Sequence, residues 1–400
     1  MKIKSLLIGS AAAIVAAPAA FAADVIIAEP EPVEYVEVCD VAGAGYFYIP
    51  GSRTCLQISG LVRHELQFGE NDSPVDGGEF NGERDGIDSL VRGELNIRTF
   101  TETELGDLTS FIRFRANDEN NDALSVVLNE ETGELDTQGA ALNGSVFLNN
   151  ATIGLGGLLM GLSDTLYDGG IAGEFDSFGG DRVHFIRYTA DLGAFSAALS
   201  LEAERSFDSR FDYVPNVVGQ ISGDIGALSV DLWAAYDDED EIEVAATGLL
   251  LEDDEFVTGD DEFSLKARVG FDFGPAALQV AGTYNSGENY YDNGYEWSVG
   301  ASATVGLGEK ASLTFGGQYF ADGLDTVATT LDVAEGEFVT VDVDGNDDAE
   351  EWRIGANVDY EIVDGFDVKV AVNYRNIDDG IDGTDDVDGF DGFIRFDRSF

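Results

Sequence analysis

The 400-residue sequence contains few cysteines, few basic residues and few long apolar runs. Its two cysteines are too few for a metal site built from a cysteine cluster. Only 21 Lys and Arg residues stand against 78 Asp and Glu residues, and the resulting net charge of −57 argues against a nucleic-acid partner. Beyond its N-terminus the chain has no segment apolar enough for a transmembrane helix, which excludes a helical inner-membrane protein.

Glycine and aromatic residues, in contrast, are frequent. The chain has 49 glycines, 11% aromatic and 44% hydrophobic residues, a composition that argues for a folded protein despite the high charge. The mean hydropathy of −0.05 is what results when each strand has one apolar and one polar face. The composition therefore favours one large all-β unit over several soluble domains.

Residues 1–22 have the pattern of a secretory signal peptide. Two lysines precede an apolar run from Leu6 to Ala17, and Ala20-Phe21-Ala22 supplies a small-x-small cleavage site. A membrane anchor is the alternative, but the run is shorter than the ~18 apolar residues that a span needs. We expect cleavage to leave residues 23–400 as a single domain, and loss of two lysines and no acids changes the charge from −57 to −59.

The two cysteines, Cys39 and Cys55, fit an oxidising compartment. They either form a disulfide or are reduced and buried, and we expect the disulfide. Closing a loop of this length would stabilise the fold by ~3 kcal/mol.

Seven short pieces rich in Gly and Asp recur along the sequence, most of them between runs of alternating apolar and polar residues. They begin at Glu104, Gly154, Asp191, Asp224, Asp272, Gly306 and Ile362. Gly and Asp tolerate the positive φ of tight hairpin turns. Longer, acidic, Gly-rich segments separate these pieces. Seven tight turns and eight long connections predict sixteen strands.

The alternation is clear in Phe366–Arg375, where Phe366 and every second residue after it are apolar or aromatic. It is weak in Ser145–Ile153 and Leu158–Leu166. Other expected strands are Leu56–Gln67, Leu90–Thr101, Leu108–Arg115, Trp352–Tyr360 and Phe390–Phe400.

Short turns that alternate with long connections are typical of a transmembrane β-barrel with short periplasmic turns and long extracellular loops. In lipid every backbone group must be paired, so such a sheet closes on itself. We expect Phe390–Phe400 to be the closing strand and Phe400 to lie in the interfacial aromatic girdle. A soluble β-sandwich or propeller is the alternative, and sequence parity alone does not say which face is turned outward.

The stretch VEYVEVCDVAGAGYFYIPGSRTCLQISG, residues 33–60, resembles the start of the mature alphaproteobacterial porins. The resemblance implies a homotrimer of sixteen-stranded antiparallel barrels in the outer membrane of a Gram-negative bacterium. It also implies that the third extracellular loop folds into each pore, and that the barrel-assembly machinery reads the C-terminal aromatic, Phe400. The long loops are more acidic than this family leads us to expect.

Basic side chains recur on the polar faces of the early and late strands. They are Arg63, Arg92, Arg98, Arg113, Arg115, Arg353, Lys369, Arg375 and Arg395. The third long loop contains DGGIAGEFDSFGGD, which offers Asp168, Glu174, Asp176 and Asp181. Opposed charges across a narrow pore would filter solutes by size and charge. The alternative is that the arginines only pair with lumenal carboxylates and stabilise the barrel.

Two further patterns in the sequence could indicate sites. His64 and His184 are the only histidines, and without a Gly-x-Ser-x-Gly motif we expect no enzyme activity. Residues 340–351 partly copy a calcium-binding loop, but Thr340 replaces the first ligand and no flanking helices are expected. We expect a solvated acidic loop there, with no metal site and no cofactor.

The sequence thus predicts a water-filled passive diffusion channel for small hydrophilic solutes and ions. Loop acids such as the Asp237–Asp240 run are expected to lie in water and to give a weak cation preference. They would also hold divalent cations that bridge to lipopolysaccharide, beside the outer-membrane lipid around the barrel. The alternatives are a solute-specific channel on the same barrel, and a surface adhesin or structural barrel with functional loops.

Overall fold

The computed structural model describes residues 37–71, 86–119, 125–128, 135–138, 146–203, 214–237, 241–244, 255–258, 262–324, 326–332, 337–343, 348–378, 380 and 386–400. The expected signal peptide lies outside these residues. The chain divides into two units, Met1–Glu37 and Val38–Phe400, and the second carries the sheet. In the described ranges no helix is long and apolar enough to cross a membrane.

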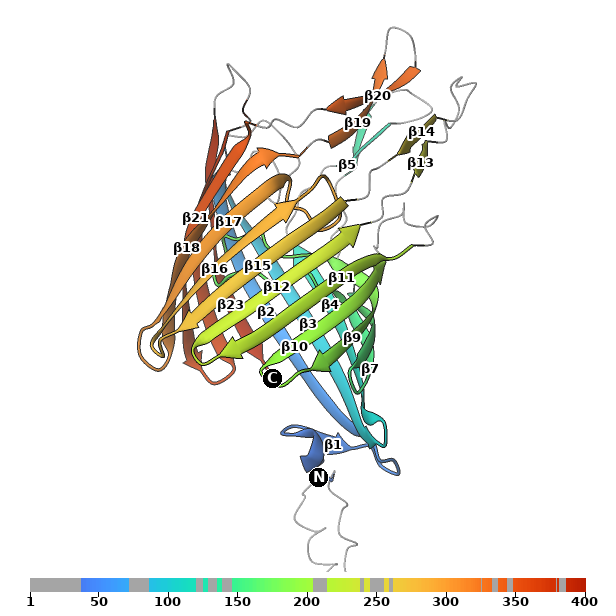
Figure 1. Cartoon of the computed structure of the whole chain (residues 1–400). Helices are drawn as coiled ribbons and strands as arrows, with labels where there is room; N and C mark the ends of the chain where they lie inside the picture. Colours follow the sequence, from blue (N-terminus) through green and yellow to red (C-terminus); the bar gives the residue numbers. More distant parts are fainter. Residues whose placement is uncertain are drawn as a thin grey trace, which may run out of the picture. The chain divides into compact units, whose positions relative to one another are not determined.

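Sixteen strands form one closed antiparallel barrel (Figure 1). In chain order they are β2 (Cys55–Asn71), β3 (Gly86–Thr103), β4 (Gly106–Glu119), β7 (Val146–Leu155), β8 (Leu158–Asp164), β9 (Arg182–Asp191), β10 (Phe195–Ala203), β11 (Asn216–Ile225), β12 (Leu228–Asp237), β15 (Glu262–Asp272), β16 (Ala276–Asn285), β17 (Tyr295–Gly306), β18 (Ala311–Gly323), β21 (Glu350–Val363), β22 (Phe366–Asp378) and β23 (Val387–Ser399). Each pairs with the next, and β23 pairs with β2. The predicted strand number is confirmed.

All seven predicted turns join consecutive barrel strands, and they lie at one end of the barrel because neighbouring strands run in opposite directions. Gly226 has φ 68° between β11 and β12, and Gly365 has φ 69° between β21 and β22. A residue with a Cβ rarely adopts this conformation, so the glycines permit two-residue turns. The eight long connections join strand ends at the other end.

Short strands outside the barrel were not predicted. β1 (Phe47–Tyr48) pairs with the start of β2. Three hairpins belong to long connections, namely β5 (Ser125–Leu128) with β6 (Leu135–Gln138), β13 (Glu241–Val244) with β14 (Glu255–Thr258), and β19 (Thr326–Asp332) with β20 (Glu337–Val343). Each hairpin forms a separate two-stranded sheet.

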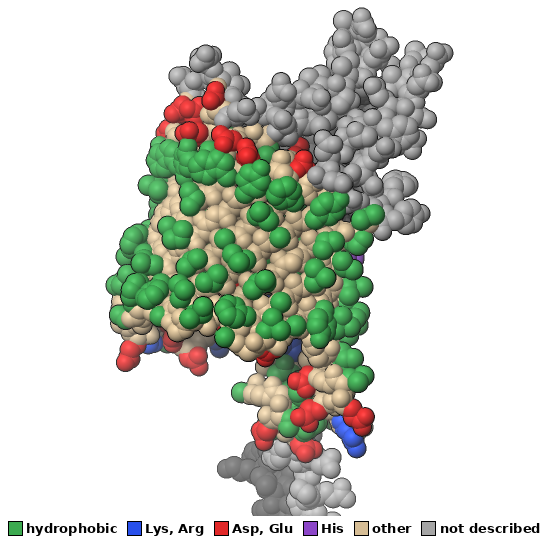
Figure 2. Space-filling view, viewed as in Figure 1, with side chains coloured by type: hydrophobic (Ala, Val, Ile, Leu, Met, Phe, Trp, Pro, Cys, Tyr) green, Lys and Arg blue, Asp and Glu red, His purple; other side chains and the backbone are tan. Residues whose placement is uncertain are grey.

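The barrel turns its apolar face outward. On β22, Val370 and Val372 are exposed, whereas the intervening Ala371 and the inward Asn373 are buried. Figure 2 shows hydrophobic side chains spread over the outer face, with acidic side chains near both ends. A soluble barrel would bury its apolar face instead, so the exterior identifies a barrel that stands in lipid.

A β-bulge explains the weak alternation in the fourth barrel strand. The register of β4 with β7 shifts between Arg113 and Phe114, which pair with Asn150 and Leu148. Asn149 is the extra residue, so Asn149 and Asn150 are buried in succession, which breaks the two-residue period.

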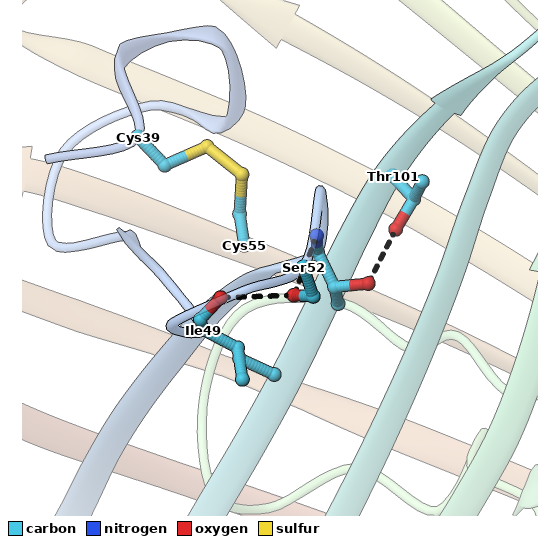
Figure 3. Close-up of a disulfide and its surroundings, with 6 residues drawn as sticks. Cys39, Ile49, Ser52, Cys55 and Thr101 are labelled. Atoms are coloured by element: carbon cyan, nitrogen blue, oxygen red, sulfur yellow. Dashed lines mark hydrogen bonds between the residues drawn. A yellow bond between two sulfur atoms is a disulfide. The ribbon is translucent and has the colours of Figure 1, made fainter. Parts of the chain in front are cut away.

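The N-terminal segment is joined to the first barrel strand by a disulfide between Cys39 and Cys55, as expected (Figure 3). Their Cα atoms are 5.9 Å apart, and both side chains are buried. Beside the disulfide, Ser52 Oγ donates a hydrogen bond to Ile49 O (3.0 Å), which closes the turn that leads into β2.

Phe400 completes the closing pair of strands. Its amide donates to Gly60 O (3.1 Å), and its carbonyl accepts from Gly60 N (2.9 Å). The Phe400 side chain is 65% exposed, and its ring lies against Gly60, where a Cβ would clash with it.

Candidate pore constriction

The connection between β8 and β9, residues 165–181, is named the inner loop here because it bonds to inward side chains of several barrel strands. It follows the fifth barrel strand and is the third long connection, as predicted. Lys266 of β15 donates through Nζ to Tyr167 O and to Phe178 O (2.7 Å), so one side chain ties both ends of the loop. Arg268, two residues further on, donates to Gly170 O (2.6 Å).

Three amide side chains fix the middle of the inner loop. Gln279 Oε1 on β16 accepts from Ala172 N (2.6 Å). Gln318 Oε1 on β18 accepts from Ser177 N (2.7 Å). Asn373 Nδ2 on β22 donates to the carbonyl of Glu174 (2.9 Å). The loop backbone is therefore held at spaced points across the lumen.

Glu202 on β10 holds the start of the inner loop. Its carboxylate accepts from Thr165 Oγ1 and from Leu166 N (2.8 Å), and lies 3.5 Å from the Arg187 guanidinium. Tyr291 adds a hydroxyl donor at 3.3 Å. A fully buried carboxylate is stable only when it is paired and hydrogen-bonded in this way.

The apolar side chains of the inner loop pack against the wall. Ile171, Phe175 and Phe178 form a buried cluster with Ala281 of β16. Tyr167 packs in a second buried cluster that includes Trp233 of β12. Most inward side chains of β15–β18, called the loop wall here, are buried, and the partly exposed Arg268 is one exception.

The four predicted loop acids have different surroundings. Glu174 forms ion pairs with Lys369 (2.6 Å) and Arg395 (3.6 Å). Asp176 Oδ2 accepts from Ile171 N (3.1 Å), and burial raises the pKa of the Asp176 carboxyl above its usual value. Asp168 and Asp181 are exposed at the two ends of the loop, where Asp181 accepts from Arg182 N (2.7 Å).

The five predicted arginines of β2–β4 share one patch, called the arginine wall here. Arg63 and Arg92 are direct cross-strand partners. Within the patch, Arg63 pairs with Asp397 (2.7 Å), Arg115 with Glu94 (2.7 Å) and Arg113 with Glu94 (3.5 Å). Arg92 donates to Asn117 (2.8 Å), and Arg98 lies 3.5 Å from Ser59 Oγ and 4.5 Å from the Phe111 ring centroid.

The three predicted arginines of the late strands also have carboxylate partners. Arg353 and Arg375 share Glu351, with Arg375 at 2.7 Å. Arg395 pairs with Glu65 in addition to Glu174. Pairing with lumenal carboxylates therefore occurs for most of these arginines, whereas Arg92 and Arg98 have no carboxylate partner among the described residues.

Sequence reasoning missed several side chains that hold the inner loop. They are Arg187, Glu202, Lys266, Arg268, Gln279 and Gln318. Lys266 and Arg268 follow Ser264 on one parity of β15, and this was the available signal for inward cations. The alternation of residues along β15 does not reveal that the inner loop lies over these two side chains.

Other expected sites are placed differently or lie outside the described residues. Asp237, expected in water, is 2% exposed and accepts from Tyr290 N (2.6 Å). The central part of the calcium-like loop, with Asp344 and Gly345, lies outside the described residues. Both histidines are exposed on strands of the barrel. Among the described residues no group of three or more acidic, His or Cys side chains could hold a metal ion.

A closed barrel with an apolar exterior, a polar interior and a loop folded into its lumen defines a transmembrane channel. Residues 24–389 match the family described as Porin subfamily, and the chain belongs to this family. It is a non-enzymatic porin of the Gram-negative outer membrane.

Curated relatives extend over nearly the whole chain. Outer membrane protein IIIA of Rhizobium leguminosarum bv. viciae is 31% identical, over 96% of this chain and 92% of the relative. Porin Omp2b of Brucella neotomae is 35% identical, over 94% and 92%. Among solved structures, the outer membrane channel DcaP of Acinetobacter baumannii aligns with a TM-score of 0.60 at 15% identity. That alignment covers 88% of this chain and 99% of DcaP and supports the fold.

Proposed function

We propose that this porin is a general-diffusion channel for small hydrophilic solutes and ions, with a weak preference for cations. The observation that carries the proposal is the inner loop, which is bonded to β10, β15, β16, β18 and β22, whereas β2–β4 carry the arginine wall. Such an arrangement narrows a water-filled passage without closing it. Solutes would then be sorted by size and charge.

Single-channel recording in a planar bilayer tests the channel. A large, persistent conductance that does not saturate with sugar or amino-acid solutes supports general diffusion. Block by one solute class would indicate a solute-specific channel, and absence of conductance would favour an adhesin or structural barrel.

The cation preference is argued from two charge sets. Near the inner loop the basic and acidic groups largely offset each other, because Glu174 pairs with Lys369 and Arg395. The remaining influence is the mature charge of −59, which is expected to concentrate cations at the pore mouth. Screening beyond ~8 Å at physiological salt keeps the preference weak. Reversal potentials in a salt gradient test it, and anion preference at low salt would contradict it.

The assembly partners are also proposals. Membership of the porin family supports a homotrimer in outer-membrane lipid, and three equal conductance steps per insertion would test it. Acidic loops are proposed to hold divalent cations that bridge to lipopolysaccharide.

Phe400 is proposed to serve assembly rather than the pore. Its side chain is outward and exposed, while its backbone completes the pairing with Gly60. Phe400→Ala is expected to lower the yield of folded, heat-modifiable protein and to leave the conductance of assembled channels unchanged. Phe390→Ala, at another outward phenylalanine of β23, is the control. Equal yields for wild type and Phe400→Ala would contradict the proposal.

A further inference from the structure

Three glycines on neighbouring strands leave a patch of the inner wall without side chains. Gly316 of β18 pairs directly with Gly355 of β21, and with Ser302 of β17 on its other side. Gly300 lies two residues before Ser302, on the same face of β17. None of the three glycines has a positive φ, so the backbone conformation does not demand glycine at these positions.

Side chains of the inner loop occupy the space that Cβ atoms would take. A Cβ at Gly300 would lie 2.9 Å from Phe178 Cε2 and 3.1 Å from Ile171 Cδ1. A Cβ at Gly355 would lie 2.8 Å from Phe175 Cβ and closer still to Asn373 Oδ1, and one at Gly316 would lie 2.5 Å from Phe175 Cζ and closer still to the Ala301 carbonyl of the neighbouring strand. The inner loop is therefore the nearest obstacle to a Cβ at Gly300, whereas at Gly316 and Gly355 the loop and the sheet together leave no room for one.

Polar side chains flank Gly316 and Gly355 in one row of cross-strand partners that runs from β16 to β22. In order, the row contains Gln279, Ser302, Gly316, Gly355 and Asn373. Gln279 and Asn373, at the two ends of this row, bond to the backbone of Ala172 and Glu174. The loop backbone is thus fixed at both ends of the row, and its aromatic side chains fill the middle.

We propose that Gly300, Gly316 and Gly355, named the glycine seat here, determine the width of the pore. The seat lets the inner loop lie one side-chain layer closer to the wall, and so enlarges the passage between the loop and the arginine wall. These are positioning residues, because they act through Phe175 and Phe178. The proposal rests on the diffusion-channel function proposed above.

Alanine substitution in the seat tests the proposal. Gly300→Ala is expected to push the loop into the lumen, with a fall in single-channel conductance of roughly a third. The uptake of neutral sugars of increasing size into liposomes should fall more steeply with sugar size than in wild type. Gly93→Ala, on the outward face of β3, is the control, because a Cβ there meets nothing within 4 Å.

Trimming the loop provides the reverse experiment. Phe178→Leu removes the ring atom that the Gly300 Cβ would meet, so Gly300→Ala/Phe178→Leu is expected to recover wild-type conductance and size limit. Phe178→Leu alone is expected to raise both, which keeps the proposal testable if the alanine variants assemble poorly. Unchanged conductance in Gly300→Ala, no recovery in the double variant, or unchanged or lower conductance in Phe178→Leu would overturn it. Absence of conductance in wild type would instead overturn the channel function.

Discussion

The arginine wall and the loop wall have the same alternation in sequence but different surroundings in the barrel. On the arginine wall, the side chains of Arg63 and Arg113 are 17% and 29% exposed. On the loop wall, Lys266 and Gln318 are only 2% and 3% exposed. Solvent reaches the side chains of the first wall, whereas those of the second lie against the inner loop. An inward position therefore does not by itself make a residue pore-lining.

The two walls also satisfy their charges differently. Lys266 is buried away from water, and its ammonium group donates to two backbone carbonyls. Its Nζ also lies 4.1 Å from the ring centroid of Tyr167 and 4.9 Å from that of Trp233. On the arginine wall, Arg113 and Arg115 share the single carboxylate of Glu94. A partly hydrated cation tolerates shared or absent partners, because water supplies the remaining hydrogen bonds.

The largest effect is expected from Lys266→Met on the loop wall. Two buried carbonyls, those of Tyr167 and Phe178, would lose their donor, which costs roughly 2–4 kcal/mol in unfolding free energy. We expect a lower heat-modification temperature and an unsteady single-channel current. Lys310→Met is the control, because the Lys310 side chain is 50% exposed at a turn. Equal behaviour of the two variants would contradict the difference between the walls.

A smaller effect is expected from Arg92→Gln combined with Arg98→Gln on the arginine wall. Removing two positive charges beside the passage should raise the cation-to-anion permeability ratio by about twofold at low salt. Stability should change little, since neither arginine has a described carboxylate partner. Reversal potentials measure the ratio, and Arg53→Gln at an exposed position outside the barrel strands is the control. A shift toward anions would contradict the expectation.

Glu174→Gln tests how much a charge on the inner loop contributes to the selectivity. It would leave Lys369 and Arg395 without their partner on the inner loop, so the cation preference should fall, by less than twofold because only one charge changes. Glu104→Gln, at an exposed turn residue, should leave the reversal potential unchanged. An equal fall in cation preference in Glu174→Gln and Glu104→Gln would show that charges outside the lumen determine the selectivity.

The smallest effect on the pore is expected from reduction of the Cys39–Cys55 disulfide, because it lies outside both walls. Conductance should stay the same, while the N-terminal segment loses a constraint that is worth ~3 kcal/mol. Mass spectrometry of protein alkylated without prior reduction should find no labelled thiol. Two labelled thiols on folded protein would show that the disulfide does not form.

Most of the barrel could be predicted because its signals are local. Turn glycines such as Gly226 and Gly365 mark the hairpins, and the two-residue period marks the strands. The predictions were least accurate where a local rule is broken. The bulge at Asn149 disturbs the period of β7, and the expected strand Leu158–Leu166 ends at Asp164 because Leu166 already packs within the inner loop.

The candidate site was only partly predictable. Parity placed the arginines on the polar face, and strand order identified the third loop. The anchors of that loop were missed because the bonds join residues far apart in sequence, as in Lys266 with Phe178, 88 residues apart. Nothing near Gly300 or Gly355 in the sequence indicates that phenylalanines from another segment pack there.

The anchoring of the inner loop also has a consequence for the order of folding. Ala172, Ser177 and Glu174 bond to partners that follow them by 107, 141 and 199 residues. These partners become neighbours only when β16, β18 and β22 have joined the sheet. Such distant contacts form slowly, because the intervening chain must be ordered first. We therefore expect the strands of the barrel to pair before the inner loop docks, so that the loop reaches its final position late in assembly.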